Sequence, residues 1–193
     1  MRRIQYHYYG GPESMQLEEF ELSSPQAGEV AVTVRAASVN PIDWKLRQGQ
    51  LKMLTGRSFP RGMGSDFAGV VRAVGPGVTL FKSGDEVFGI ARLKESGAYA
   101  EAVVTRESYL AHKPAELLYE QAAALATAAF MAWDGLVERA RLRRGRRVFV
   151  GCHRNTAETG RGGVAAVQRR ASASYAVERP ILSVRAASVI ETP

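Results

Sequence analysis

Residues 64–77, Gly-Ser-Asp-Phe-Ala-Gly-Val-Val-Arg-Ala-Val-Gly-Pro-Gly, decide the fold class of this chain. Within them, Phe67–Val74 is a nearly continuous apolar run, which is typical of a buried β-strand. Gly75-Pro76-Gly77 must then turn the chain, because proline fixes φ and glycine permits positive φ. The stretch therefore predicts a buried strand that ends in a tight turn.

The same combination of short apolar runs and turn residues recurs on both sides of this stretch. Val30–Ala37, Glu86–Ile90 and Gly97–Thr105 are three further predicted strands, and Ser83-Gly84-Asp85 is a predicted turn. Residues 1–110 are therefore expected to be rich in β-structure. Several short strands punctuated by glycine and proline indicate a closed or partly closed barrel.

The pattern changes near residue 118. Tyr119–Arg139 is rich in alanine and free of proline, which predicts one long helix or two helices broken near Thr127. Arg146–Val150 follows as a short predicted strand. A change from successive strands to helix followed by strand indicates a domain boundary, so we predict domains over residues 1–118 and 119–193.

Composition limits the class of protein. Hydrophobic residues make up 46% of the 193 residues and charged residues 23%, as in globular proteins. No apolar run reaches the length of a membrane span, which is about 18 residues or more, and no secretory signal is evident. A single cysteine, Cys152, cannot form an internal disulfide, so a reducing cytoplasm is the expected location.

The net charge of +7 is unevenly distributed. Residues 139–193 contain 12 Arg and three Glu, which gives +9, so the remainder of the chain carries −2. A basic tail could bind nucleic acid or another partner. However, Phe149 and Tyr175 stand alone among these arginines and form no aromatic platform to stack on bases, so we expect no nucleic-acid binding.

Six motifs occur in a fixed order between residues 38 and 124. They are Ser38–Arg47, Gly64–Val71, Val74–Val78, Gly84–Gly89, Gly97–Glu101 and Ala122–Ala124. In this order and spacing, the series resembles the zinc-free quinone oxidoreductase branch of the medium-chain dehydrogenase/reductase superfamily. The resemblance implies a mainly β GroES-like barrel domain followed by a partial α/β Rossmann-type segment. It places the active site in the cleft between these two parts.

The resemblance also implies the chemistry. Zinc-dependent members carry a Cys where this chain has Asn40 and a His where it has Ser65, so no metal is expected. The implied reaction is hydride transfer from NADPH to a small-molecule quinone or an α,β-unsaturated carbonyl. A homodimer is a possible assembly.

The site residues that the resemblance implies lie in two regions. Asn40, Asp43 and Lys45 are the expected catalytic residues, and Asn40 and Thr127 are expected to contact the cofactor. The alternative is that Asn40-Pro41 forms a plain turn, Asp43 and Lys45 form a surface pair, and Thr127 only packs. Tyr99 is expected to have a packing role.

The nucleotide-binding pattern departs from the family after Val150. A glycine turn and the start of a helix are recognisable in Gly160, Gly162, Gly163 and Val164, about ten residues later than expected from the strand. These four residues are the predicted pyrophosphate contacts. The displacement and the early end of the pattern predict a C-terminally truncated product. The remaining alternatives are an inactive remnant, or pseudoenzyme, consisting of a GroES-like domain, and a module that binds a partner or nucleic acid through the basic tail.

Overall fold

The computed structural model describes residues 1–92 and 97–144, which are mainly β. Its strands are β1 (Arg2–Tyr6), β2 (Met15–Glu19), β3 (Glu29–Ser38), β4 (Arg61–Gly62), β5 (Asp66–Val74), β6 (Glu86–Ile90), β7 (Ala102–Arg106) and β8 (Leu110–His112). Its α-helices are α1 (Pro41–Arg47), α2 (Lys52–Thr55) and α3 (Tyr119–Trp133). Two 3₁₀ turns, Pro12–Ser14 and Glu107–Tyr109, and a π-helical segment, Asp134–Arg139, complete the description.

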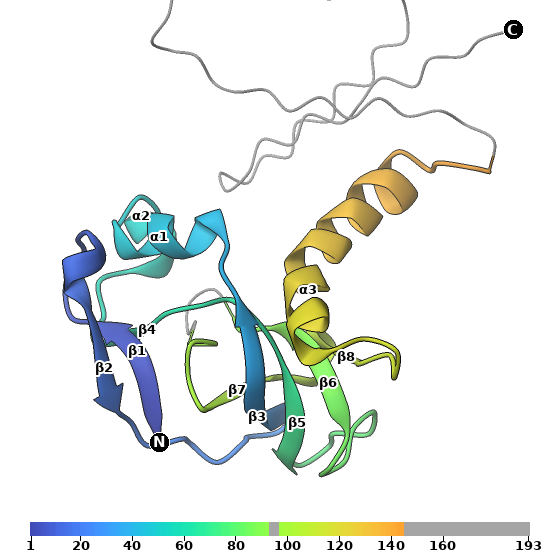
Figure 1. Cartoon of the computed structure of the whole chain (residues 1–193), viewed down its shortest axis with the longest axis horizontal. Coiled ribbons are helices and arrows are strands. Elements are labelled where there is room, and N and C mark those ends of the chain that lie inside the picture. The colour runs from blue at the N-terminus through green and yellow to red at the C-terminus, as the bar shows by residue number, and fades with distance from the viewer. Residues whose placement is uncertain (93–96, 145–193) are drawn as a thin grey trace, which may run out of the picture. The chain divides into compact units, whose positions relative to one another are not determined.

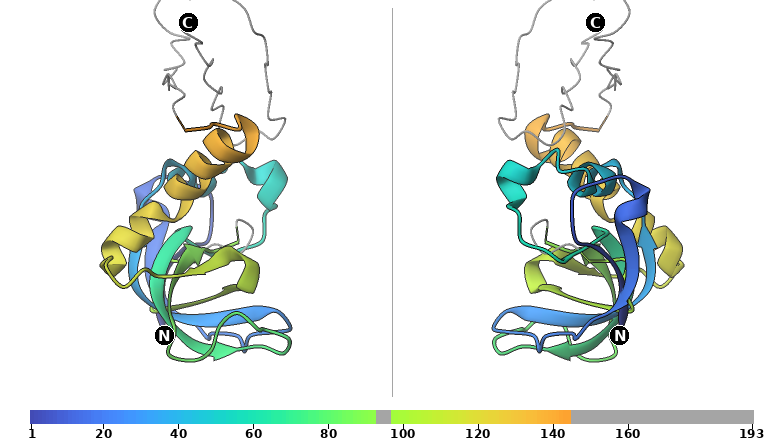
Figure 2. Two further views of the ribbon diagram at one scale, coloured as in Figure 1. Left: turned by 90° about the vertical axis from the view of Figure 1, so that its right-hand side faces the viewer. Right: turned by 90° about the vertical axis from the view of Figure 1, so that its left-hand side faces the viewer.

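The strands form two antiparallel sheets. One sheet has the order β7-β3-β5-β6-β8 and the other has the order β2-β1-β4. A bridge between Arg3 and Ala100 joins the two, and the Ile4 N–H donates to the Tyr99 carbonyl at 2.8 Å beside it. The sheets therefore enclose a common interior as a partly closed barrel, and the two side views in Figure 2 show the strands curving around it.

Alternation along β5 builds two packing surfaces. Phe67 and Val71 point into the barrel, where they join Val30, Val32 and Val87 in a core whose members are at most 7% exposed. Ala68 faces the opposite side and packs against alanines of α3. Small side chains on both partners let the helix lie close to the sheet, beside β6 and β8 in Figure 1.

The predicted strands within the described residues are largely confirmed, with one difference. The strands at Val30–Ala37, Phe67–Val74 and Glu86–Ile90 are present within one residue of the expected bounds. The prediction for Gly97–Thr105 was wrong in its first half, because regular pairing begins only at Ala102. The backbone before it is instead held by the Gly64 carbonyl, which accepts from two successive N–H groups.

The helix is one continuous element through Thr127, so the break considered there is absent. It ends at Trp133, and residues 134–139 continue as the π-helical segment. By contact, the first compact unit is Met1–Met131, and the second begins at Ala132. The predicted strand Arg146–Val150 lies outside the described residues. Among the described helices, none is both long and apolar enough to cross a membrane.

Candidate functional site

The candidate site lies where β3 ends and β5 begins. Ser38, the last residue of β3, pairs with Asp66, the first residue of β5. Asn40 follows β3 and leads into α1, while Ser65 comes directly before β5. Residues that are more than 20 positions apart in the sequence therefore meet at one end of the barrel (Figure 1).

The Asn40-Pro41 sequence starts a helix. Asn40 has an extended backbone, with φ −117° and ψ 152°, and Pro41 occupies the first turn of α1, where its missing N–H costs nothing. The Asp43 carboxylate accepts a hydrogen bond from the Asn40 backbone N–H at 2.8 Å. This is the arrangement by which an acidic residue in the first turn fixes the start of a helix. The plain-turn alternative is therefore wrong.

Asp43 is buried and accepts three hydrogen bonds. Asp43 is only 3% exposed. Besides the Asn40 N–H, it accepts from the Ser65 hydroxyl at 2.7 Å and from the Tyr99 hydroxyl at 2.9 Å. A surface pair between Asp43 and Lys45 is therefore also wrong. A hydrogen bond to a charged group contributes about 1.5–3 kcal/mol, so these bonds offset the cost of burying the carboxylate.

Tyr99 reaches Asp43 by crossing Gly64. Gly64 has φ +89°, and a Cβ atom there would lie 2.3 Å from the Tyr99 ring, so the ring needs glycine beneath it. Burial raises the pKa of the Tyr99 phenol, and the negative charge and hydrogen bond of Asp43 and the charge of Asp66 raise it further. At neutral pH the hydroxyl is therefore a hydrogen-bond donor.

Asp66 is a second buried carboxylate, and it holds α3. It is fully buried, and it accepts the Thr127 backbone N–H at 3.0 Å and also the Thr127 hydroxyl. An N–H in the middle of an α-helix normally bonds to the preceding turn, so an external acceptor at this position is unusual. The Thr127 hydroxyl proton is engaged by Asp66, and its oxygen keeps the capacity to accept a bond.

Ser38 links the two carboxylates. Its hydroxyl donates to Asp66 at 3.5 Å and accepts from the Asn40 side-chain amide at 3.4 Å. Its carbonyl accepts from the Tyr99 hydroxyl at 3.3 Å. We call these seven residues the two-carboxylate network: Ser38, Asn40, Asp43, Ser65, Asp66, Tyr99 and Thr127. In the part of the chain that the structure describes, no buried side-chain polar atom lacks a partner.

The structure thus brings together three of the four predicted site residues in this region: Asn40, Asp43 and Thr127. Lys45 is partly buried on α1, and its ammonium group lies 5.6 Å from the centroid of the Trp44 ring. Over residues 1–92 and 97–144 it forms no ion pair, so its charge remains available to a ligand.

At the two positions where the resemblance implies metal ligands in zinc-dependent enzymes, the Ser65 hydroxyl donates to Asp43, and the Asn40 side-chain amide donates to Ser38 while its backbone N–H donates to Asp43. An amide and a hydroxyl are poor ligands for zinc compared with thiolate and imidazole. No cluster of three or more His, Cys, Asp or Glu side chains that could hold a metal occurs among the described residues.

Sequence reasoning missed Ser38 and Asp66 and assigned Tyr99 only to packing. All three lie within the six ordered motifs. Their place in a motif, rather than their residue type, was therefore the feature from which the sequence could have identified them. The predicted pyrophosphate contacts Gly160, Gly162, Gly163 and Val164 lie outside the described residues.

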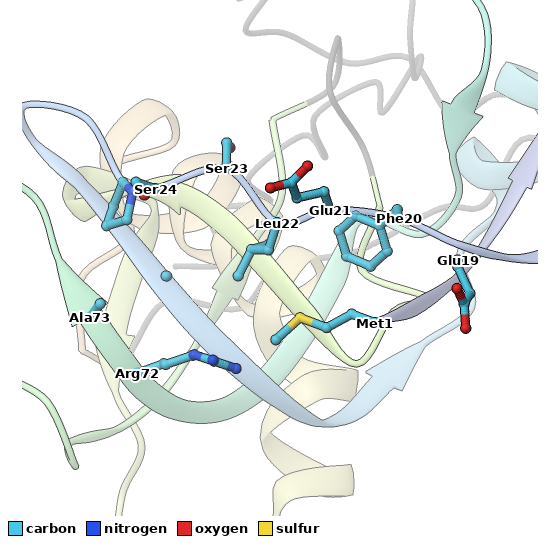
Figure 3. A pocket seen from close by; sticks show the side chains of 11 residues that line it. Met1, Glu19, Phe20, Glu21, Leu22, Ser23, Ser24, Arg72 and Ala73 are labelled. Carbon is cyan, nitrogen blue, oxygen red and sulfur yellow. The ribbon is translucent and has the colours of Figure 1, made fainter.

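A separate groove lies away from this network. Met1, Glu21 and Arg72 are among the side chains that line it, as Figure 3 shows, and its volume is about 680 Å³. The segment that follows β2 forms one wall, and β5 contributes Arg72 and Ala73 to the other. None of the network residues lines this groove, so it is not the site that the motifs define.

Comparison with known proteins agrees with this fold. Residues 26–115 match the alcohol dehydrogenase GroES-like domain. The chain is 36% identical over 144 residues to the chloroplastic quinone-oxidoreductase homolog of Spinacia oleracea, which covers 74% of this chain and 44% of the spinach protein. The described fold is therefore that of a GroES-like domain.

Two solved structures extend the similarity. The Escherichia coli quinone oxidoreductase complexed with NADPH is 33% identical, with a TM-score of 0.65, and the match covers 72% of this chain and 41% of that one. The CurK enoyl reductase is 25% identical, with a TM-score of 0.67, over 75% of this chain and 45% of that one. Over this part of its length the chain is similar to quinone oxidoreductases and to an enoyl reductase of the medium-chain dehydrogenase/reductase superfamily. It spans less than half the length of the relatives named here.

Proposed function

We propose that this protein is a zinc-independent reductase that transfers a hydride from NADPH to a quinone or an α,β-unsaturated carbonyl. The observation that carries the proposal is the placement of Asn40. Its backbone and side chain are both held by the two-carboxylate network, at the position where zinc-dependent members of the family carry a metal ligand. A fixed neutral amide suits an acceptor that needs orientation and a hydrogen bond rather than a Lewis acid.

The described residues fit the nicotinamide end of the cofactor. One N–H of the Asn40 amide is bonded to Ser38, which leaves its second N–H and its carbonyl oxygen for a carboxamide or an acceptor oxygen. The Thr127 oxygen can accept a further bond, and Lys45 offers a positive charge to an acceptor oxygen or a phosphate. The proposed contacts at Gly160, Gly162, Gly163 and Val164 would hold the pyrophosphate.

Bound NADPH would supply two electrons as a hydride to an electrophilic carbon of the acceptor, leaving NADP⁺, and a proton from water would complete the reduction. Charge then develops on the acceptor oxygen. Asn40 would donate a hydrogen bond to that oxygen, and Lys45 would stabilise it electrostatically. Asp43 has its oxygens engaged by three donors, so we propose that it orients Asn40 and does not transfer a proton itself.

Both acceptor classes remain within the proposal. The spinach and Escherichia coli relatives are named for quinones, and the CurK protein is named as an enoyl reductase. In each class the new negative charge is delocalised onto oxygen, so the same hydrogen-bond donor can serve both. A reducing cytoplasm is the compartment we propose, which suits a single unpaired cysteine.

The experiment is a reductase assay on the full chain. NADPH consumption is followed with a naphthoquinone and, separately, with a 2-enoyl thioester. We expect turnover with at least one acceptor and a rise in Tm on addition of NADPH. Asn40→Ala should lower kcat by about 10²–10³-fold, as expected for loss of an oxyanion donor. Gln50→Ala is the matched control. Gln50 carries an exposed side-chain amide shortly after α1, so its replacement should leave kcat unchanged.

An inactive remnant predicts a different result. A pseudoenzyme would show neither turnover nor a change in Tm with NADPH, and that outcome would overturn the proposal. A partner-binding role of the basic tail predicts association that weakens steeply with salt.

A further inference from the structure

One hydroxyl of the two-carboxylate network, that of Tyr99, has no assigned part in the reaction. The Tyr99 hydroxyl lies 2.9 Å from Asp43 Oδ2 and 3.3 Å from the Ser38 carbonyl oxygen. Asp43 Oδ2 is also the oxygen that accepts the Asn40 backbone N–H at 2.8 Å. The phenol therefore bonds to residues on both sides of Asn40, namely the end of β3 and the first turn of α1.

We infer that Tyr99 is a positioning residue, whose hydroxyl fixes Asn40 through Asp43 and Ser38. This inference rests on the proposed function for its meaning in catalysis. Tyr99 itself need not touch the substrate or the cofactor. The Tyr99 hydroxyl lies within hydrogen-bond distance of both Ser38 and Asp43. It therefore restricts movement of the segment between these two residues, which contains Asn40.

The local geometry supports a role more specific than packing. Gly64 has positive φ and leaves room for the Tyr99 ring, so the path of the ring to Asp43 is built into the backbone before β5. A tyrosine that only filled space would need no acceptor at its tip. Here the single hydroxyl proton lies between two acceptors, with Asp43 the nearer one, and burial near two carboxylates keeps the hydroxyl protonated by raising its pKa.

Loss of the hydroxyl should free Asn40 on both sides. In Tyr99→Phe the ring remains, but Asp43 Oδ2 keeps only the Asn40 N–H, and the Ser38 carbonyl loses this donor. Positioning errors of an ångström cost enzymes up to about 10²-fold in rate. We therefore expect kcat to fall by about ten- to a hundredfold, with KM for the acceptor changed by less than about threefold, because few ground-state contacts are lost.

A measurement that needs no activity is available, because the chain contains only two asparagines, Asn40 and Asn155. Labelling the full chain with ¹⁵N-asparagine gives few enough NMR signals to follow, and Asn155→Gln assigns them. In Tyr99→Phe we expect the Asn40 backbone amide to exchange with solvent at least about tenfold faster, and its side-chain signals to shift. Tyr109→Phe, at an exposed tyrosine, is the matched control and should leave both unchanged.

A second variant keeps the test decisive if Tyr99→Phe does not fold. Ser38→Ala removes the hydroxyl that accepts from the Asn40 side chain but keeps the carbonyl that accepts from Tyr99. We expect it to shift the Asn40 side-chain signals while the backbone amide stays protected, since Tyr99 and Asp43 remain. Loss of protection at that amide in Ser38→Ala would overturn the inference.

The outcomes separate this inference from the proposed function. Unchanged Asn40 signals in folded Tyr99→Phe overturn the positioning role, whatever the activity. Wild-type kcat in Tyr99→Phe overturns it as well. If the wild-type chain transfers no hydride, the proposed function fails, and the NMR comparison still decides whether Tyr99 orders Asn40.

Discussion

Asp43 has donors against both of its oxygens, and this explains why the site depends on its charge. Ser65 bonds to Oδ1, while Asn40 and Tyr99 bond to Oδ2. A carboxylate is the side chain of this size that accepts from all of them without rearrangement. Asn40 and Asp43 were recognised from the sequence by their motif, but their relation to each other was not, because it depends on three distant segments meeting.

Replacing the Asp43 carboxylate should destabilise the fold. Asp43→Asn places an amide N–H₂ among hydrogen-bond donors and removes the charge, which should lower the free energy of unfolding by about 1–3 kcal/mol. Asp85→Asn is the control, because Asp85 accepts a single exposed backbone N–H at 2.9 Å. Urea unfolding measures both. Equal losses in the two variants would show that burial and multiple bonding at Asp43 contribute nothing extra.

The phenol of Tyr99 should make stability depend on alkaline pH. Its pKa is raised in the folded state above the ordinary value of 10.0, first by burial and then by Asp43. The folded state therefore holds this proton more tightly. The contribution is complete below pH 10 and is lost as pH rises toward the folded-state pKa.

Urea unfolding between pH 8 and about 11 tests this linkage. The decline in stability of the wild type above pH 10 should be shallower in Tyr99→Phe and unchanged in Tyr109→Phe. Tyr6 also has a raised pKa, from burial, so some decline will persist. An identical slope in wild type and Tyr99→Phe would contradict the assignment.

At the scale of elements, the start of α3 is fastened to the barrel by a second group of polar side chains. The Lys113 side chain is 5% exposed and bonds to Glu86 of β6 at 3.0 Å and to the Leu117 carbonyl at 2.8 Å. Tyr119, the first residue of α3, donates its hydroxyl to Glu86. With the Asp66–Thr127 bonds, this gives the helix two attachments about two turns apart.

The Glu86 attachment should be sensitive to acid. The hydrogen bond from Tyr119, followed by that from Lys113, holds the pKa of Glu86 below its ordinary value of 4.5. Its contribution to stability is therefore present above pH 4.5 and is lost as pH falls through the folded-state pKa. Tyr119→Phe should lower the urea midpoint at neutral pH, and the difference from wild type should shrink below pH 4.5.

Tyr8→Phe provides the control, because Tyr8 is 53% exposed and lies in the loop after β1. It should leave the midpoint unchanged at both pH values. A Tyr119→Phe effect that is the same at pH 7 and at low pH would mean that Glu86 is not the partner through which the hydroxyl acts.

Elements were predicted well where one signal dominated. β5 and β6 carry continuous or alternating apolar residues between glycine-rich turns, so local pattern was sufficient. The segment before Ala102 was assigned to a strand on the same grounds, but tertiary bonds from Gly64 take its N–H groups. The contact of Thr127, in the middle of α3, is likewise tertiary, because its acceptor Asp66 lies more than 60 positions earlier in the chain.

At the scale of the whole molecule, the ordered motifs predicted the barrel because most of them mark a turn or a buried strand of it, whereas Ala122–Ala124 lies in α3. The network could not be read from the same motifs, since hydrogen bonds between Ser38, Asp66 and Tyr99 depend on how three strand ends meet. The motifs place residue types in sequence order only. Which carboxylate faces which donor is decided by register, such as the pairing of Ser38 with Asp66.

The way in which the barrel closes also determines when the chain can fold as it is made. β1 is synthesised first, yet it pairs with Arg61–Gly62 and, through Arg3, with Ala100. At synthesis rates of about 5–20 residues per second, this strand waits roughly 5–20 s for its last partner. Until residues 61–62 are available, β1 and β2 form only a hairpin, which is marginally stable alone. The emerging polypeptide is therefore a candidate client for chaperones until residue 100 has left the ribosome.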